Sequence, residues 1–394
     1  MKHIKNNEKF IINILLFLIV ISGIYFCFIG GYGSDEDTLP MIHVFEAKLS
    51  NGRFVSSRFT GNPVAELGIG FLSHFLGSWA ANLSTYLFLL LGLIAFYFSF
   101  EKKEFFKEIN IFLFLALTSP ILFFDNLEPI DYSWAFFFFS LGLLLLSKKI
   151  FELSILFFAI SIGVRINYTL FVLIAIFFFE FNSPMSFNRR ITLFFSTFII
   201  GCLFYLPVWF YNSYDLSWLT VARPINQGIV GLLGRFIYKL YICLGYISFF
   251  VLIYYFYKFF NNFKTIKNIR FLTLLCFSNL AIFLWIPSEL SYLQLFLVAI
   301  NFIVFKLNIK KFIYFICIGN LISWFVFVSP IKIIYSNNDL CAPTNATSVV
   351  LDLQLKKGFY FQYLSSRERI KCWVNDSSSE RGKRILSGRA LKID

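Results

Sequence analysis

Charged residues are scarce in this chain. Asp, Glu, Lys and Arg make up 14% of its 394 residues, whereas 58% of the residues are hydrophobic and 56 are Phe. An ordinary soluble domain is about half apolar and about a quarter charged. A soluble fold of this length needs polar residues on the outer face of every surface helix, and this composition cannot supply them. The scarcity of charge therefore predicts an integral membrane protein.

Common catalytic and cofactor signatures are also missing. The three His residues show no HxxH or HExxH spacing, and the chain has no GxSxG, no glycine-rich nucleotide motif and no CxxC pair. These absences disfavour a zinc protease and an ATPase engine. Only two of the seven cysteines, Cys341 and Cys372, lie in polar sequence. They form either a disulfide in an oxidising compartment or two free thiols.

The net charge of +13 has two interpretations, nucleic-acid binding or membrane orientation. Nucleic-acid binding requires Lys and Arg to cluster on one folded basic face. Here they fall mainly between hydrophobic runs and in the C-terminal tail. The positive-inside rule explains that distribution, so we expect membrane lipids and no nucleic acid as partners.

Hydrophobic runs predict an all-α, polytopic membrane protein with about 11 transmembrane helices, because about 20 apolar residues span a bilayer. The first predicted span follows Lys2, Lys5 and Lys9. The predicted spans cover residues 10–30, 79–100, 109–124, 132–147, 150–164, 166–181, 191–211, 237–257, 271–286, 291–305 and 312–330. With the N-terminus inside, inner segments hold seventeen basic residues and outer loops before the tail hold six. This asymmetry supports the assignment.

The sequence divides into a transmembrane part, residues 1–330, and an outer C-terminal tail, residues 331–394. Within the first outer loop, 31–78, apolar residues recur at helical spacing on both sides of the turn 53–62. Two helices that lie in the membrane interface are therefore expected. Pro63 suits the first turn of the second helix. The tail beyond residue 377, rich in Ser, Arg and Lys, is expected to be flexible.

Acidic residues directly after the first span are the leading candidates for chemistry. Asp35, Glu36 and Asp37 precede the first expected interfacial helix, and Glu66 lies on the second. The N-terminus of a helix stabilises a carboxylate, and an ionised carboxylate at a membrane surface could serve as a general base. The alternative is that Asp37 only caps the helix.

A second acidic group, Asp125, Glu128 and Asp131, is predicted on the same side of the membrane. These acids could bind a divalent metal ion or an acceptor, or they could be ordinary loop acids. Arg165 lies between two apolar runs, where a charge is costly unless it is paired. Its guanidinium could hold a lipid phosphate, reach an outer headgroup, or pair with one of the loop acids.

The first 80 residues resemble the glycosyltransferase C superfamily, which takes sugars from polyprenyl-phosphate carriers and includes protein mannosyltransferases and lipid A aminoarabinose transferases. The resemblance rests on an acid after the first span, a helix ending in glycine, and a second interfacial helix. In this chain these features are Asp35-Glu36-Asp37-Thr38, Gly52, Arg58-Phe59-Thr60-Gly61-Asn62-Pro63 and Glu66.

The resemblance implies a membrane glycosyltransferase that moves a sugar, with inversion, from a polyprenyl-phosphate donor to an acceptor at the outer face. The distance to Gly52 favours Asp37 as the base, while the position of the usual Asp-Glu pair favours Asp35. Arg165 and Arg58 are the implied ligands of the donor phosphate, and Glu66 is an implied metal or acceptor ligand. A lipid-linked saccharide flippase or polymerase component is the alternative.

Abundant Phe, Ile, Lys and Asn favour a bacterial source, and therefore a location in the bacterial cytoplasmic membrane.

Overall fold

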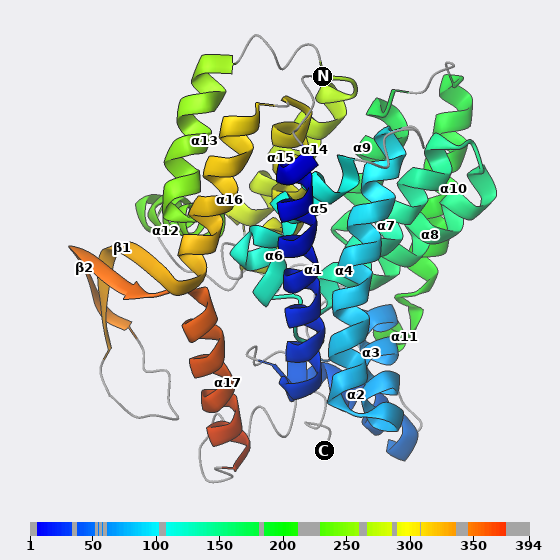
Figure 1. Cartoon of the computed structure of the whole chain (residues 1–394). Helices are drawn as coiled ribbons and strands as arrows, with labels where there is room; N and C mark the ends of the chain where they lie inside the picture. The colour runs from blue at the N-terminus through cyan, green and yellow to red at the C-terminus, as the bar shows by residue number, and fades with distance from the viewer. Residues whose placement is uncertain are drawn as a thin grey trace.

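A computed structural model shows a bundle of helices with a β-hairpin and a final helix at one side (Figure 1). Its described residues are 6–33, 38–51, 54, 57, 61–101, 108–180, 185–211, 229–259, 266–285, 290–307, 309–335 and 346–375. The chain is mostly helical and has few strands. The expected helical membrane fold is therefore confirmed in outline.

The helices of the first half range from 5 to 24 residues in length. They are α1 Asn6–Ile29, α2 Thr38–Asn51, α3 Pro63–Leu76, α4 Ser78–Phe100, α5 Ile109–Thr118, α6 Pro120–Phe124, α7 Asp131–Ser147, α8 Phe151–Val164 and α9 Tyr168–Phe178. The second half contains α10 Phe187–Leu203, α11 Leu206–Tyr211, α12 Ile229–Leu244, α13 Tyr246–Phe259, α14 Ile269–Trp285, the short 3₁₀ helix η4 Leu290–Leu293, α15 Gln294–Leu307 and α16 Lys310–Phe325.

Three stretches among the described residues are long and apolar enough to cross a bilayer: Glu8–Ile29, Ser78–Phe100 and Leu290–Leu307. A fourth is added if Val230–Leu244 and Tyr246–Tyr254 form one bent span. Other apolar helices are only 10–17 residues long. The chain is thus a helical membrane protein, and the count of about 11 spans stays a prediction.

Two of the predicted spans are broken at identifiable residues. Pro120 separates α5 from α6, since proline has no N–H to continue the helical hydrogen bonding. Gly245, with φ +78, separates α12 from α13, which are bent by 97°. The left-handed backbone at Gly245 suits glycine, which has no Cβ. The continuous span predicted over residues 237–257 is therefore wrong.

The two helices predicted in the first loop are confirmed as α2 and α3. Pro63 occupies the first turn of α3, as its position predicted. The face of α3 that packs inward carries Ala65, Glu66 and Ile69, whereas Phe71 and Phe75 are about half exposed. The side of α3 that carries both Phe residues therefore points outward.

The C-terminal tail contains β structure, so the all-α expectation is wrong there. The strand β1, Val326–Tyr335, pairs antiparallel with β2, Ala346–Lys357, and α17, Phe359–Asn375, follows. The last predicted span, 312–330, ends as a helix at Phe325 instead. β-Branched and aromatic residues after Phe325 favour an extended strand. Cys341 lies outside the described residues, as does the tail beyond residue 375.

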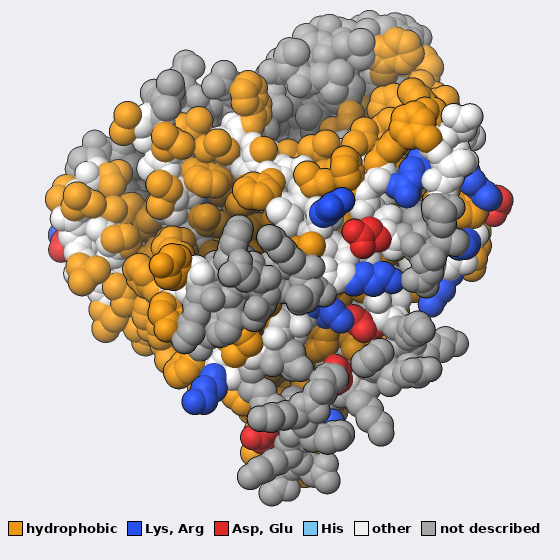
Figure 2. Space-filling model, turned by 90° about the horizontal axis from the view of Figure 1, so that it is seen from above, with side chains coloured by type: hydrophobic (Ala, Val, Ile, Leu, Met, Phe, Trp, Pro, Cys, Tyr) orange, Lys and Arg blue, Asp and Glu red, His pale blue; other side chains and the backbone are white. Residues whose placement is uncertain are grey.

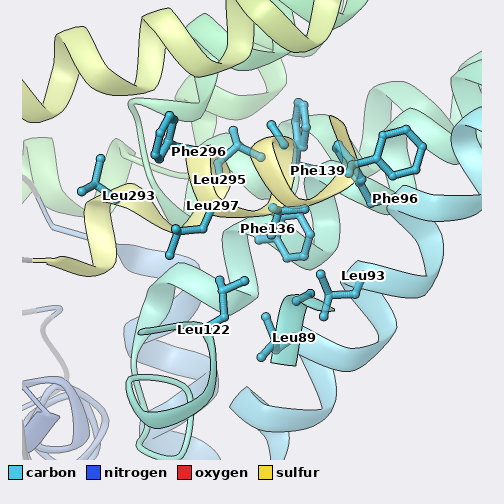
Figure 3. Close-up of a cluster of buried hydrophobic side chains, with 14 of the residues drawn as sticks. Leu89, Leu93, Phe96, Leu122, Phe136, Phe139, Leu293, Leu295, Phe296 and Leu297 are labelled. Carbon is cyan, nitrogen blue, oxygen red and sulfur yellow. The ribbon is translucent and has the colours of Figure 1, made fainter. Parts of the chain in front are cut away.

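Aromatic and aliphatic side chains from α4, α6, α7, η4 and α15 form a buried cluster in the bundle (Figure 3). Leu89, Leu93 and Phe96 of α4 lie beside Phe136 and Phe139 of α7. A Cβ added to Gly92 would lie 2.8 Å from the Phe136 ring, so glycine permits the close approach of α4 and α7. Small residues at helix contacts allow such packing in membranes, where lipid supplies little hydrophobic drive between helices.

Basic residues gather at the end of the bundle where α1 begins. Seen from that end, most Lys and Arg side chains lie on one half, together with acidic side chains, whereas hydrophobic side chains dominate the other half (Figure 2). Exposed basic residues at helix ends there include Lys148, Lys149, Arg189, Lys267 and Lys311. The opposite end of the bundle carries the start of α7, the end of α8 and the first loop (Figure 1).

Candidate active site

A buried ion pair joins α7 to α8 at the end of the bundle opposite Asn6. Nη1 of Arg165 lies 2.8 Å from Oδ1 and 2.9 Å from Oδ2 of Asp131. Asp131 is fully buried, and Arg165 is 6% exposed. The side chain of Asn62, just before α3, donates a hydrogen bond to Oδ2 of Asp131. Three elements distant in sequence are therefore held at one polar cluster, Asn62–Asp131–Arg165.

Two tyrosine rings shield the guanidinium of Arg165. Its Cζ lies 3.7 Å from the ring centroid of Tyr132 and 4.8 Å from that of Tyr292, which belongs to η4. The two rings contact each other edge to face. A cation over desolvated aromatic faces gains about 2 kcal/mol. Ion pair and rings together explain how a charge is tolerated between two apolar helices.

Glu66 lies near this cluster on the first turn of α3 and is also fully buried. Its Oε1 accepts hydrogen bonds from the backbone N–H and the hydroxyl of Ser57. Glu66, Asp131 and Arg165 all interact electrostatically with the buried Tyr205 between α10 and α11. The carboxylate of Glu66 thus ties the loop before α3 to the helix itself, close to the ion pair.

The turn that leads to the acidic segment packs against the second acidic group. A Cβ added to Gly33 would lie 2.3 Å from Cβ of Glu128, and Gly33 has φ +84. The side chain of Asn82 donates hydrogen bonds to the carbonyl oxygens of Cys27 and Gly31, at 3.1 and 2.8 Å. The end of α1 and the loop after it are therefore fixed beside Glu128.

The helix α17 completes this region, which the sequence did not indicate. Arg367 donates a hydrogen bond to the carbonyl oxygen of Ile29 at the end of α1, where a cation also stabilises the helix dipole. Burial raises the pKa of the Tyr363 hydroxyl well above its usual range, Glu128 raises it further, and Arg367 lowers it. The sequence of this polar, charged tail contains no signal that α17 packs against the end of α1.

Asp125 has a different environment from Asp131. Its Oδ2 accepts a hydrogen bond of 2.7 Å from Ser291 in η4. Nearby, Asn126, Ser133 and Gln294 form a separate buried chain of hydrogen bonds. Of the three acids in the second group, Asp131 is part of the ion pair, Glu128 contacts the first loop, and Asp125 fixes η4.

Four of the predicted site residues, Asp35, Glu36, Asp37 and Arg58, lie outside the described residues. Described neighbours bracket the acidic segment, with Gly33 against Glu128 on one side and the buried Thr38 on the other. In the part of the chain that is described, no group of three His, Cys, Asp or Glu side chains could hold a metal ion.

The arrangement defines a polytopic, mostly helical membrane fold in which the buried Glu66, Asp131 and Arg165 lie at one end of the bundle. The sequence matches no family model and no curated protein. The fold is similar to that of ArnT from Cupriavidus metallidurans bound to undecaprenyl phosphate, with a TM-score of 0.53 and 10% identity over 76% of this chain and 60% of that one. The apo structure of the same protein gives a TM-score of 0.52 and 12% identity over 74% of this chain and 58% of that one.

ArnT is a lipid A aminoarabinose transferase and a glycosyltransferase of the C superfamily. The resemblance found in the first loop is thereby matched by the fold of most of the chain. This chain covers about 60% of the ArnT structure's length, and at this identity the likeness concerns the fold alone.

Proposed function

We propose that this protein is a membrane glycosyltransferase that uses a lipid-linked sugar donor. The observation that carries the proposal is the fold shared with ArnT, whose structure binds undecaprenyl phosphate, together with buried acids and an Arg at one end of the bundle. Fold alone does not determine function, so the proposal depends on these residues as well. The donor would enter laterally from the bilayer, and the acceptor from the water beside it.

In the proposed reaction, the acceptor hydroxyl attacks the anomeric carbon of the sugar as the bond to the lipid phosphate breaks. Asp37 takes the proton of the hydroxyl, and the phosphate leaves with the bonding electrons, which inverts the anomeric centre. Asp35 is the second candidate for the base. Gly33, which lies against Glu128, and the buried Thr38 are the described residues that bracket both acids in the sequence.

The pairing of Arg165 with Asp131 refines the proposed roles of the basic residues. Much of the charge of Arg165 is balanced by Asp131, so Arg165 acts mainly by holding α7, α8 and the start of α3 in place. Arg58, between Ser57 and Asn62, is then the better candidate for the donor phosphate. Arginine suits that role because its planar fork matches phosphate oxygens.

The decisive experiment supplies radiolabelled polyprenyl-phosphate sugars and candidate acceptors to the purified protein in liposomes. We expect radiolabel to move to an acceptor, and we expect Asp37→Asn to reduce the rate by about 10²- to 10⁴-fold, the usual contribution of a general base. Asp35→Asn, two positions earlier in the sequence, is the matched comparison. If Asp35→Asn abolishes transfer and Asp37→Asn does not, the roles are exchanged.

A lipid-linked saccharide flippase or polymerase component is the second candidate. A flippase would carry charged groups at mid-span on several helices, whereas the buried charges described above lie at one end of the bundle. The same liposomes discriminate between the candidates. Movement of labelled donor across the bilayer without any transfer product would overturn the transferase proposal.

A further inference from the structure

The strand β2 exposes an unusual number of large apolar side chains. Val349 is 61% exposed, Leu351 87%, Leu353 77% and Leu355 76%. The three leucines alternate in sequence with Asp352, Gln354 and Lys356. The register shifts by one residue between Ser329 and Ile331, so Leu355 pairs with Val328 and Leu351 pairs with Ile331. A patch of this kind on a protein surface marks a contact with lipid or with another protein.

The register of the hairpin shows that the leucine at the base of β2 faces away from the bundle. Phe327 and Ser329 of β1 are buried, and the Ser329 hydroxyl lies 3.3 Å from that of Tyr238 on α12. Opposite them on β2 are Lys356 and Gln354, which share that inner face. Leu355 pairs with Val328 and so lies on the other face, where it is 76% exposed.

The helix α12, which supports the hairpin, runs across the bundle rather than along it. It is bent by 97° from α13, and α13 packs lengthwise against α16 (Figure 1). Its exposed apolar residues Val230, Leu233 and Ile237 are spaced three and four apart, so they share one helix face. An amphipathic helix across the direction of the spans is typical of the membrane interface.

The hairpin also continues a surface that faces lipid. Phe315, Ile318, Ile322 and Phe325 are 39–54% exposed and lie along one side of α16. Residue Phe325 is followed directly by β1, and the hairpin projects sideways from the bundle at this point (Figure 1). An element that projects sideways from the end of a membrane helix meets the boundary between headgroups and acyl chains.

We propose that α12 and the β1–β2 hairpin form an interfacial platform, whose apolar side chains Leu351, Leu353 and Leu355 insert into the leaflet on the side of the candidate active site. The basic residues Lys332 and Lys357 of the same hairpin would meet lipid phosphates at the headgroup level. The platform is a site of lipid contact outside the helical spans, and it does not depend on the proposed transferase chemistry.

The test places a fluorescent reporter on the full-length protein in lipid vesicles. Leu353→Cys is introduced into a chain carrying Cys202→Ser, Cys341→Ser and Cys372→Ser, so that the described thiols that stay are buried ones. The new thiol is labelled with an environment-sensitive NBD dye. Asp352→Cys, at the exposed polar position next to Leu353, is the matched control.

For Leu353→Cys we expect blue-shifted emission, loss of most of that emission with lipids that carry a nitroxide near the headgroup, and little quenching by iodide. The dye at residue 352 should show no blue shift, little quenching by the nitroxide lipids and strong quenching by iodide. Equal iodide quenching at both positions would overturn the proposal, because the face would then be open to water. Blue-shifted emission that resists nitroxide lipids and disappears on dilution into excess lipid would overturn it in favour of a second copy of the chain.

Discussion

At the scale of single residues, the structure contains a charge pair that is almost completely buried. Removing both members of a buried ion pair together is often nearly neutral, whereas removing one leaves an uncompensated buried charge. Asp131 and Arg165 have this geometry, with Asn62 and two tyrosine rings completing their environment.

We therefore predict that Arg165→Met or Asp131→Asn alone lowers stability by about 3 to 5 kcal/mol. The double substitution should lower it by clearly less than the sum of the two. The measurement is the thermal midpoint of the purified protein at one fixed scan rate. Lys148→Met, at an exposed position, is the control and should change stability by less than about 0.5 kcal/mol. Strictly additive losses would show that the two residues are not coupled.

A second residue-scale prediction concerns the turn after α1. Gly31 and Gly33 both have positive φ, +59 and +84, but only Gly33 is crowded, by Glu128. Gly31→Ala should cost about 1 to 2 kcal/mol for the left-handed backbone alone. Gly33→Ala should lower the stability by more than Gly31→Ala does. It should also reduce the rate of sugar transfer, because the added methyl group displaces the turn beside Glu128.

The Gly31 variant is the matched control for Gly33, since no described atom lies within 4 Å of its added Cβ. Thermal midpoints and transfer rates of both variants are compared in the same lipid. Equal effects of the two substitutions would show that the contact between Gly33 and Glu128 does not position the loop.

At the scale of elements, breaks in apolar helices determine where the platform and the site lie. Gly245 permits the bend that turns α12 across the bundle, and its added Cβ would lie 2.8 Å from Oγ of Ser323. Gly234, within α12, has open space around it. Substitution by alanine should therefore change the stability of the protein in opposite directions at Gly245 and at Gly234.

Gly245→Ala is predicted to destabilise the protein by about 1 to 2 kcal/mol, since alanine disfavours a left-handed backbone. Gly234→Ala is predicted to stabilise it by up to about 1 kcal/mol, because alanine is the better helix former. Thermal midpoints of the two variants test both signs. Stabilisation by Gly245→Ala would contradict the bend described for α12 and α13.

Much of the element order could be predicted, but breaks within elements could not. The helices α2 and α3 follow from apolar spacing and Pro63, which are local signals. The bend at Gly245 and the strand from Val326 depend on what α12, α16 and α17 pack against. Hydropathy in a sliding window averages over such single residues, which is why 237–257 and 312–330 were predicted as unbroken spans.

At the scale of the whole molecule, charge predicts orientation. Exposed basic residues gather at the end where α1 begins, and the positive-inside rule assigns that end to the cytoplasm. The candidate site and the β-hairpin would then lie on the outer side. This assignment can be tested without knowledge of the reaction.

In sealed right-side-out vesicles, a membrane-impermeant maleimide should label Asp352→Cys at once and Lys148→Cys only after permeabilisation. Both positions are exposed, one on β2 and the other at the end of α7. The substitutions Cys202→Ser, Cys341→Ser and Cys372→Ser remove the background labelling of native thiols. Immediate labelling of residue 148 and protection of residue 352 would reverse the proposed topology.

The sequence by itself determined that this is a helical membrane protein with two short helices in its first loop, because hydropathy and helical spacing are local properties. The sequence also indicated Glu66, Asp131 and Arg165 as candidate site residues. Only the tertiary structure decided that Arg165 pairs with Asp131, that Asn62 joins them, and that α17 reaches the end of α1. These contacts join residues from 34 to 338 positions apart. No local pattern encodes them, since the partner of a buried charge is set by which helices pack together.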